Sequence, residues 1–348
     1  MSLNFCTLFN TGYLARGLAM YHSLRKHNPD SHLYVFAFDD PSYEYLRKEN
    51  LPGLTVISLR EFEDEELLRI KPTRTAGEYC WTCTASTIRY AIRTFNLPQC
   101  TYLDADMYFY ADPKVLLDEL GTDSVIITEH RYSPAYDQSE ISGKYCVQFV
   151  TFNNDDAGMK VLENWRNACI DWCYARVEDG KFGDQKYLDA WTSQFKGVHE
   201  LRHLGGGLAP WNMQQYRFHS ENGTIKGLTL AGGKTFDAVF FHFHGLRLYK
   251  DGIVSLTGDA YEMNDTARDL FFFPYVKTLL ETERDILKKA PALNPNGRQD
   301  TAPKKPMDFL SLLRWYQYDV RQSLSNIGGK QTRNRRKHHH YYFTDSIV

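Results

Sequence analysis

The sequence predicts an α/β fold, with a Rossmann-like, mostly parallel central sheet flanked by helices. Residues 5–9, 33–38 and 54–59 are short apolar runs of the length that buried strands have. Residues 14–27 and 43–48 separate these runs and carry apolar residues at helical spacing. Strands that alternate with helices at this spacing indicate parallel βαβ units, so the start of the chain already predicts the fold class.

The same alternation continues through the middle of the chain and predicts its remaining elements. One further strand is expected to end just before Asp104, in the apolar run that precedes this residue. Other strands are expected over residues 125–128, 147–152 and 238–243. Helices are expected over residues 61–69, 82–95, 112–117, 156–174 and 187–191.

Composition divides the chain into three parts. Residues 1–290 are expected to form one large domain, because the strand and helix patterns fall within them. Residues 291–306 contain four prolines beside glycine, asparagine and lysine, which is the composition of a linker. Residues 307–348 begin with an apolar stripe at helical spacing and continue with basic residues. They predict a C-terminal helical extension, formed by an amphipathic helix and a basic tail.

Charge and cysteine content exclude several classes of function. The formal net charge of −2 provides no overall positive field, so nucleic acid is not an expected partner. The seven cysteines lack the spacing of a disulfide framework or a zinc ribbon, which favours a reducing, cytoplasmic setting. The sequence has neither a basic start followed by an apolar stretch nor a run of about 18 apolar residues, so no secretory signal or membrane span is expected.

The C-terminal part predicts contact with a membrane surface. Trp315 and Tyr316 lie in the amphipathic segment, and a cluster of basic residues follows it. A segment of this kind suits an anionic membrane, so peripheral association with the cytosolic face is expected. A helix docked on the large domain is an equally good interpretation of the apolar stripe. The basic residues are Lys330, Arg333, Arg335, Arg336 and Lys337.

Two carboxylates directly follow the end of a predicted buried strand. Asp104 and Asp106 follow an apolar run, with one neutral residue between them. In open α/β sheets, ligands bind in the crevice at the carboxyl ends of the strands, where Asn10 and Asp39 are also expected. Two carboxylates this close repel each other unless a cation lies beside them. Because Mn²⁺ and Mg²⁺ prefer oxygen ligands, the pair predicts a site for one of these ions.

Other polar side chains stand in apolar surroundings later in the chain. His242 and His244 end an apolar strand and point to the same side of it. Gln148 interrupts an apolar strand and needs a hydrogen-bond partner if it is buried. Cys80, Trp81 and Cys83, in contrast, are interpreted as packing residues.

Taken together, these motifs occur in the order found in one group of enzymes. The chain resembles nucleotide-sugar glycosyltransferases of the GT-A fold, most closely the retaining galactosyltransferase and glycogenin-like family (family 8-like), over residues 3–260. It departs from the family pattern where the family usually carries Asn-Ala-Gly and this chain has Cys146, Val147 and Gln148. The matching segments are Thr7–Tyr13, Thr87–Tyr90, Tyr102–Asp106, Gly183–Gln185, Trp211–Asn212 and His242–Gly245.

The resemblance implies a metal-dependent hexosyltransferase with its catalytic domain in residues 1–290. It implies a UDP-sugar donor and a glycan or lipid-linked glycan acceptor, as in cell-surface polysaccharide assembly, with retention at the anomeric carbon. Asp104, Asp106 and His242 would bind Mn²⁺ or Mg²⁺, and Asp184 and Gln185 would be catalytic. The acceptor side would include Gln148, Trp211 and Asn212. The donor would contact Thr7, Phe9, Asn10, Tyr13, Asp39, Arg89, Asp104, Ala105, Gly245, Arg247 and Lys250.

Two other classes of function remain open at this point. The chain could be a self-glycosylating primer or a non-catalytic nucleotide-sugar-binding partner, with tyrosines near its C-terminus as acceptors. It could also be a sugar nucleotidyltransferase, although residues 8–18 lack the glycine-rich basic loop that this chemistry usually brings. The acceptor tyrosines of a primer would be Tyr316, Tyr318, Tyr341 and Tyr342.

Overall fold

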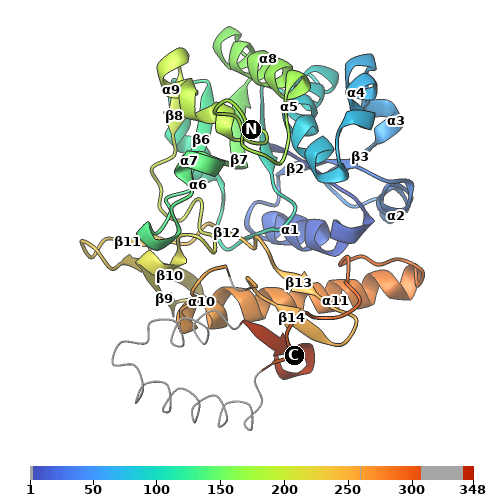
Figure 1. Cartoon of the computed structure of the whole chain (residues 1–348), viewed down its shortest axis with the longest axis vertical. Helices are drawn as coiled ribbons and strands as arrows, with labels where there is room; N and C mark the ends of the chain where they lie inside the picture. The colour runs from blue at the N-terminus through green and yellow to red at the C-terminus, as the bar shows by residue number, and fades with distance from the viewer. Residues whose placement is uncertain (1–2, 259, 307–339) are drawn as a thin grey trace.

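The computed structural model describes residues 3–258, 260–306 and 340–348, and these have the predicted α/β architecture (Figure 1). The central sheet has seven strands in the order β3-β2-β1-β4-β7-β6-β8. Neighbouring strands are parallel except at β7, which is antiparallel to β4 and β6. The mostly parallel central sheet is therefore confirmed. Its strands are β1 (Asn4–Phe9), β2 (His32–Ala37), β3 (Leu54–Ser58), β4 (Gln99–Leu103), β6 (Val125–Glu129), β7 (Tyr145–Asn153) and β8 (Val198–Glu200).

Helices connect the strands of this sheet in the predicted order. The α-helices before residue 200 are α1 (Leu14–His27), α2 (Asp40–Glu49), α3 (Leu59–Phe62), α4 (Glu65–Ile70), α5 (Ala76–Thr94), α6 (Lys114–Leu117), α7 (Ser139–Ser142), α8 (Asp156–Asp171) and α9 (Trp191–Gln194). Short 3-10 helices are η1 (Thr11–Tyr13), η2 (Lys71–Thr73), η3 (Asp118–Leu120), η4 (Pro134–Tyr136) and η5 (Lys186–Ala190).

The helices pack on both faces of the sheet because its strands are apolar on both sides. In β1, Cys6 and Leu8 belong to the apolar core shared with α5 and α8. The alternate residues Phe5 and Phe9 belong to the core shared with α1. In Figure 1, α5 and α8 lie at the top of the view and α1 lies below them. The sheet is thus fixed between two helical layers, which hold its strand ends in place.

Several predicted helices have different bounds in the structure, and local capping explains two of these differences. The segment 61–69 forms two short helices because the Asp64 carboxylate accepts a hydrogen bond from the backbone at the start of α4. The helix predicted over 82–95 already begins at Ala76, where Thr75 and Glu78 form a capping box.

Beyond residue 200, the described part of the chain adds three smaller sheets and a long helix around a third apolar core. Figure 1 shows this part in the lower half of the view. No helix was predicted where α11 lies. The strands are β5 (Met107–Phe109) paired with β12 (Phe240–His242), then β9 (Tyr216–Glu221), β10 (Thr224–Thr229), β11 (Thr235–Asp237), β13 (Arg247–Leu248), β14 (Ile253–Ser255) and β15 (Tyr341–Phe343). The helices are η6 (Met213–Gln215), α10 (Asp265–Ala267), the π-helical η7 (Arg268–Phe272), α11 (Phe273–Lys289) and η8 (Thr344–Ser346).

The described residues after α11 pack against the body of the protein. Within the segment 291–306, predicted as a linker, Pro295 accepts a hydrogen bond from the backbone of Ala15, and Arg298 forms an ion pair with Glu283. The strand β15 pairs antiparallel with β14. The predicted amphipathic helix over 307–324 and the basic cluster after it lie outside the described residues. Among the residues that are described, no helix is long and apolar enough to cross a membrane.

Candidate active site

A cavity of about 630 Å³ opens at the carboxyl ends of β1 and β4. This is the edge of the sheet where the sequence predicts ligand binding. The connections after both strands contribute to its lining, together with α5, β7 and the segment after β12. The predicted site residues in this lining are Phe9, Asn10, Tyr13, Asp104, Ala105, Asp106, Asp184, Gln185, Trp211 and His242.

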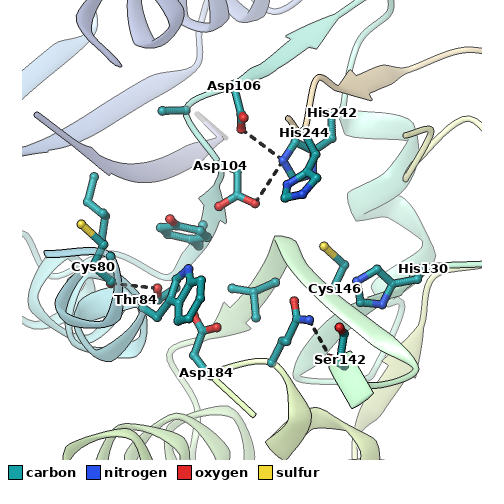
Figure 2. Close-up of a pocket in the computed structure, with 18 of the residues that line it drawn as sticks. Cys80, Thr84, Asp104, Asp106, His130, Ser142, Cys146, Asp184, His242 and His244 are labelled. Atoms are coloured by element: carbon teal, nitrogen blue, oxygen red, sulfur yellow. Dashed lines mark hydrogen bonds and ion pairs between the residues drawn. The ribbon is translucent and has the colours of Figure 1, made fainter. Parts of the chain in front are cut away.

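Strand pairing brings His242 to the two acidic residues from a distant part of the chain. β12 pairs antiparallel with β5, and His242 is opposite Met107, the residue after Asp106. The Asp106 carbonyl also accepts a hydrogen bond from the backbone of Phe243, at 2.9 Å. As a result, His242 Nε2 lies 3.1 Å from Asp106 Oδ1 and 3.7 Å from Asp104 Oδ2 (Figure 2). The predicted set of two carboxylates and one imidazole therefore converges in the cavity.

The charges in this cluster depend strongly on one another. Burial raises the pKa of Asp104 to about 6, although the His242 charge opposes this rise. Burial would also raise the pKa of Asp106, but the charge and the hydrogen bond of His242 hold it well below its usual range. Burial would lower the pKa of His242, but Asp106 raises it well above the ordinary value. Asp106 and His242 thus form a buried ion pair, with Asp104 beside it.

The donor set suits a divalent cation in its chemistry. Two carboxylates and one imidazole nitrogen are ligands of the kind that bind Mn²⁺ or Mg²⁺, and the nitrogen favours Mn²⁺. Within the described residues, no group of three potential ligands is already arranged around a single ion position. Asp104, Asp106 and His242 would therefore have to move closer around one point to enclose an ion.

Asp184 and Gln185 face the same cavity from the loop before η5. The Asp184 carbonyl accepts a hydrogen bond from Trp165 Nε1 at 2.8 Å, and this fixes the backbone of the loop. Burial raises the pKa of Asp184 to about 7, against the effect of a hydrogen bond to Thr84. Gln185 Nε2 donates to the Ser142 carbonyl at 2.6 Å, which leaves its amide oxygen as the atom that can accept from a ligand.

Several predicted donor residues lie outside the cavity lining, because other contacts hold them. The Asp39 carboxylate caps α2 and accepts hydrogen bonds from the backbone and hydroxyl of Thr11, so it supports the loop that carries Asn10. Arg89 donates from Nε to Glu163 on α8, at 2.8 Å. Thr7 is fully buried inside β1.

The remaining predicted residues outside the lining either follow β12 or are buried in the wall of the cavity. Gly245 is in a turn with φ of 82°, and Arg247 is exposed at the start of β13. Lys250 is also exposed and pairs with Asp300 at 2.7 Å. Asn212 is buried and donates to the carbonyls of His130 and Gly207, so it shapes the wall rather than facing the cavity. Gln148 is buried behind His242.

The structure also adds residues that the sequence analysis did not assign to a site. Cys80 and Trp81 line the cavity from α5, and Cys80 also packs against the apolar core, as predicted. His244 lies beside His242 and Trp211, at the same edge of the cavity. Its position on the same side of the strand as His242 was the available signal. Further lining side chains are His130, Tyr132, Cys146, Phe182 and Tyr261.

A buried arginine links the loops around the cavity. Arg16 in α1 is 3% exposed and makes no salt bridge with any described residue. Its guanidinium donates to the carbonyls of Gly12, Leu246 and Asn296, at distances of 3.3, 3.2 and 3.0 Å. It also lies 4.7 Å from the ring centre of Tyr13. One side chain therefore holds the loop after β1, the turn after β12 and the segment after α11 together.

Replacement of Arg16 by methionine is expected to destabilise the protein, because it leaves buried carbonyls without a donor. Each such group costs about 1–3 kcal/mol. The free energy of unfolding, measured by urea denaturation, should fall by several kcal/mol. Arg25→Met is the matched control on the same helix, since the half-buried Arg25 donates to a single carbonyl, that of Ser31. Equal losses in the two variants would contradict the linking role of Arg16.

Comparison with known proteins identifies relatives along most of the chain. The uncharacterized protein YfnF of Bacillus subtilis (strain 168) is 30% identical over 305 residues, which cover 85% of this chain and 96% of YfnF. The chain belongs to the YfnF family. A second Bacillus subtilis protein, the uncharacterized protein YfnD, is 29% identical over 283 residues, which cover 80% of this chain and 89% of YfnD. No family model matches this member of the YfnF family.

Solved structures with a similar arrangement are remote from this YfnF-family chain. The galactosyltransferase LgtC, in complex with donor and acceptor sugar analogues, has a TM-score of 0.45 and 14% identity, over 87% of this chain and 98% of LgtC. The bifunctional glycosyltransferase WbbM has a TM-score of 0.47 and 11% identity, over 83% of this chain and 51% of WbbM. Mouse xyloside xylosyltransferase 1 has a TM-score of 0.42 and 12% identity, over 70% of this chain and 98% of that protein. TM-scores of this size do not indicate a function. The function is therefore inferred from the residues that line the cavity.

Proposed function

We propose that the protein is a metal-dependent glycosyltransferase. It moves a sugar from a UDP-linked donor to a glycan or glycolipid acceptor, with retention at the anomeric carbon, in the assembly of a cell-surface polysaccharide. One observation carries the proposal: the β5–β12 pairing brings His242 to within 3.1 Å of Asp106, in a cavity that Asp184 also lines. A cluster of buried carboxylates and imidazole with strongly shifted pKa values, at the carboxyl edge of a parallel sheet, is typical of an active site.

In this proposal, the acidic end of the cavity binds the diphosphate of the donor. Asp104, Asp106 and His242 would hold Mn²⁺ or Mg²⁺, which, when bound, acts as a Lewis acid that stabilises the charge on the leaving diphosphate. Exposed Arg247, whose charge acts on His244 at the edge of the cavity, would contact the phosphates. Tyr13, with 36% of its surface exposed at the cavity, offers a ring for stacking on the uracil.

The opposite end of the cavity binds the sugar that is transferred. The Gln185 amide oxygen accepts a hydrogen bond from a sugar hydroxyl, while its nitrogen stays bonded to Ser142. Asp184 accepts from a second hydroxyl and holds the sugar toward the acceptor. The ring of Trp81, beside Phe182, lines this end of the cavity and offers an apolar face for a pyranose ring. Trp211 offers a second ring, beside His242 at the acidic end. Binding at these groups orients the donor and excludes water around its anomeric carbon.

The alternative functions gain no support from the described residues. Tyr341 is buried in β15 and Tyr342 is partly buried beside it, so neither is presented as an acceptor for a self-glycosylating primer. Tyr316 and Tyr318 lie outside the described residues. Association with the cytosolic membrane face also depends on residues outside them, and it stays a prediction.

A panel of nucleotide sugars tests the proposed function directly. In Mn²⁺, UDP-sugars are expected to raise the melting temperature, because a ligand at 100 times its Kd stabilises a protein by about 2.7 kcal/mol. GDP-sugars at the same concentration are the matched control and should stabilise less. Chelation of the metal by EDTA should remove the effect. Equal stabilisation by UDP-sugars with and without EDTA would contradict the metal dependence.

Product analysis in the same samples separates the rival classes of function. A transferase releases UDP at a rate that rises when an external glycan acceptor is added. A self-glycosylating primer instead gains hexose mass on its own chain, which mass spectrometry detects. A nucleotidyltransferase would form a UDP-sugar from UTP and a sugar 1-phosphate. Release of UDP that no acceptor accelerates would contradict the proposal.

A further inference from the structure

We infer that Gln148 is a positioning residue that orients His242 for metal binding, and this inference rests on the proposed function. Gln148 is in β7, where its side chain is fully buried. Its Oε1 atom lies 2.7 Å from His242 Nδ1. The amide is thus on the opposite side of the imidazole ring from Asp104 and Asp106, which face Nε2. Gln148 was predicted on the acceptor side, but its side chain contacts His242.

The backbone of Gln148 contacts a second residue of the same cluster. Its carbonyl accepts a hydrogen bond from the Asp104 N–H at 3.2 Å, just beyond the end of the β4–β7 ladder. Gln148 therefore holds Asp104 through its main chain and His242 through its side chain. Asp104 and His242 come from segments far apart in sequence, and this one residue of β7 contacts both of them.

The hydrogen bond to Gln148 determines which imidazole nitrogen can bind a cation. Because a carbonyl oxygen can only accept, Nδ1 of His242 must donate its proton to Oε1. The nitrogen left for a cation is then Nε2, which faces Asp104 and Asp106 and where a bound cation would replace the proton of the ion pair. Histidines that bind metals nearly always donate their other N–H to an acceptor in this way, which fixes both the tautomer and the ring orientation.

The amide nitrogen of Gln148 indicates that this residue does not serve mainly to stabilise the fold. Nε2 of Gln148 is buried and has no hydrogen-bond partner among the described residues. Gly207, with φ of 112°, passes close to it: a Cβ atom there would lie 3.4 Å from Nε2. An unpaired buried donor of this kind costs about 1–3 kcal/mol. An apolar residue of similar size would remove this unpaired donor, but it could not hold His242 and would leave the His242 Nδ1–H without its acceptor.

A second side chain on the same face of β7 could also orient the imidazole. Cys146 is two residues before Gln148, and its thiol contacts His242. A thiol is a weak hydrogen-bond partner, whereas the amide oxygen is a strong acceptor at short distance. The effect of Cys146→Ala therefore shows whether the thiol or the amide holds the ring.

The test is direct measurement of Mn²⁺ binding by electron paramagnetic resonance, without substrate, on the full chain. Gln148→Leu is expected to raise the Kd for Mn²⁺ by about 10- to 100-fold. Its melting temperature should stay close to that of the wild type, because removal of the unpaired Gln148 Nε2 offsets the loss of the acceptor of His242 Nδ1–H. Gln148→Glu keeps an acceptor opposite Nδ1 and should restore the Kd to within a few-fold of the wild type. Cys146→Ala should change it little.

Thr151→Val is the matched control for a buried polar residue of the same strand. Thr151 is fully buried and its hydroxyl lies 2.9 Å from that of Thr101, on a part of β7 that does not contact His242. This variant should lower the melting temperature and leave the Kd for Mn²⁺ unchanged. Loss of binding in Gln148→Leu together with a matching fall in its melting temperature would overturn the inference, since it would indicate a merely structural role.

Failure of the inference and failure of the proposed function give different results. If Gln148→Leu binds Mn²⁺ like the wild type while Asp106→Asn does not, the positioning role is wrong and the metal site stands. If Cys146→Ala weakens binding as much as Gln148→Leu, or if Gln148→Glu fails to restore it, the role assigned to the amide oxygen is wrong. If the wild type does not bind Mn²⁺, or Asp106→Asn binds it equally well, the proposed function itself fails.

Discussion

Replacement of Asp106 by asparagine is expected to reduce kcat by at least about 10²-fold, the usual cost of removing one group that stabilises charge in the transition state. Asparagine keeps the shape of the side chain and removes its negative charge. That charge is present at all ordinary pH values, because the neighbouring His242 holds the pKa of Asp106 low against the effect of burial. Without it, the site loses the carboxylate closest to His242 and with it most of its affinity for a divalent ion.

The measurement is the rate of UDP release from a UDP-sugar in Mn²⁺, together with the melting temperature with and without donor. Asp112→Asn is the matched control, because Asp112 is exposed, lies shortly after β5 and is outside the cavity lining. It should retain wild-type activity. An Asp106→Asn variant that UDP-sugars still stabilise in Mn²⁺ as strongly as the wild type would show that Asp106 does not hold the ion.

The framework around Asp106 was predictable because it depends on local patterns. The apolar runs of β1, β2 and β3 lie between amphipathic helices, and alternation of this kind leaves few arrangements other than a parallel sheet. A carboxylate that directly follows a buried strand must then lie at the carboxyl edge of that sheet. The position of Asp104 and Asp106 follows from these two facts alone, without any knowledge of the rest of the chain.

Other features depend on contacts between distant segments, which local patterns do not contain. The approach of His242 to Asp106 requires the pairing of β12 with β5. Arg89 is on the predicted helix, but an acidic partner on α8, Glu163, holds it away from the cavity. The direction of the Gln148 side chain likewise depends on where His242 lies.

The part of the chain between β14 and the segment 291–306 shows a different limit. It forms α10, the π-helical η7 and α11, yet no helix was predicted there. Phe271 and Phe272 are both buried there, because the region packs between the smaller sheets and α1 rather than on one face of a large sheet. Apolar residues on several sides of a helix weaken the periodicity on which sequence analysis depends.

Asp184→Asn is expected to lower activity by about 10²-fold or more and to stabilise the protein at neutral and alkaline pH. The loss of activity follows because a neutral amide lacks the charge with which the Asp184 carboxylate holds and orients a sugar hydroxyl. The gain in stability follows because burial raises the pKa of the Asp184 carboxyl to about 7. Active sites often retain such groups at a cost in stability.

The direction in which stability changes with pH follows from the number of protons that the folded and unfolded states bind. Between the ordinary pKa of an aspartate and a pH of about 7, the folded protein keeps the Asp184 proton while the unfolded chain releases it. The folded state binds more protons in this range, so the stability of the wild type falls as the pH rises through it. Each unit of pKa difference corresponds to about 1.4 kcal/mol, so the loss reaches a few kcal/mol at pH 8. Asparagine does not titrate and removes this loss.

The measurement is the free energy of unfolding of both proteins by urea at pH 4, 6 and 8. The two values should agree at pH 4, and Asp184→Asn should be more stable at pH 8. Asp104, whose pKa burial raises to about 6, contributes to the pH dependence of both proteins and largely cancels in the difference. Asp179→Asn is the matched control, since Asp179 is exposed in the same connection, with φ of 50°, which asparagine tolerates. It should change neither stability nor activity. A stability that falls with pH as steeply in Asp184→Asn as in the wild type would show that another group holds the proton in the cavity.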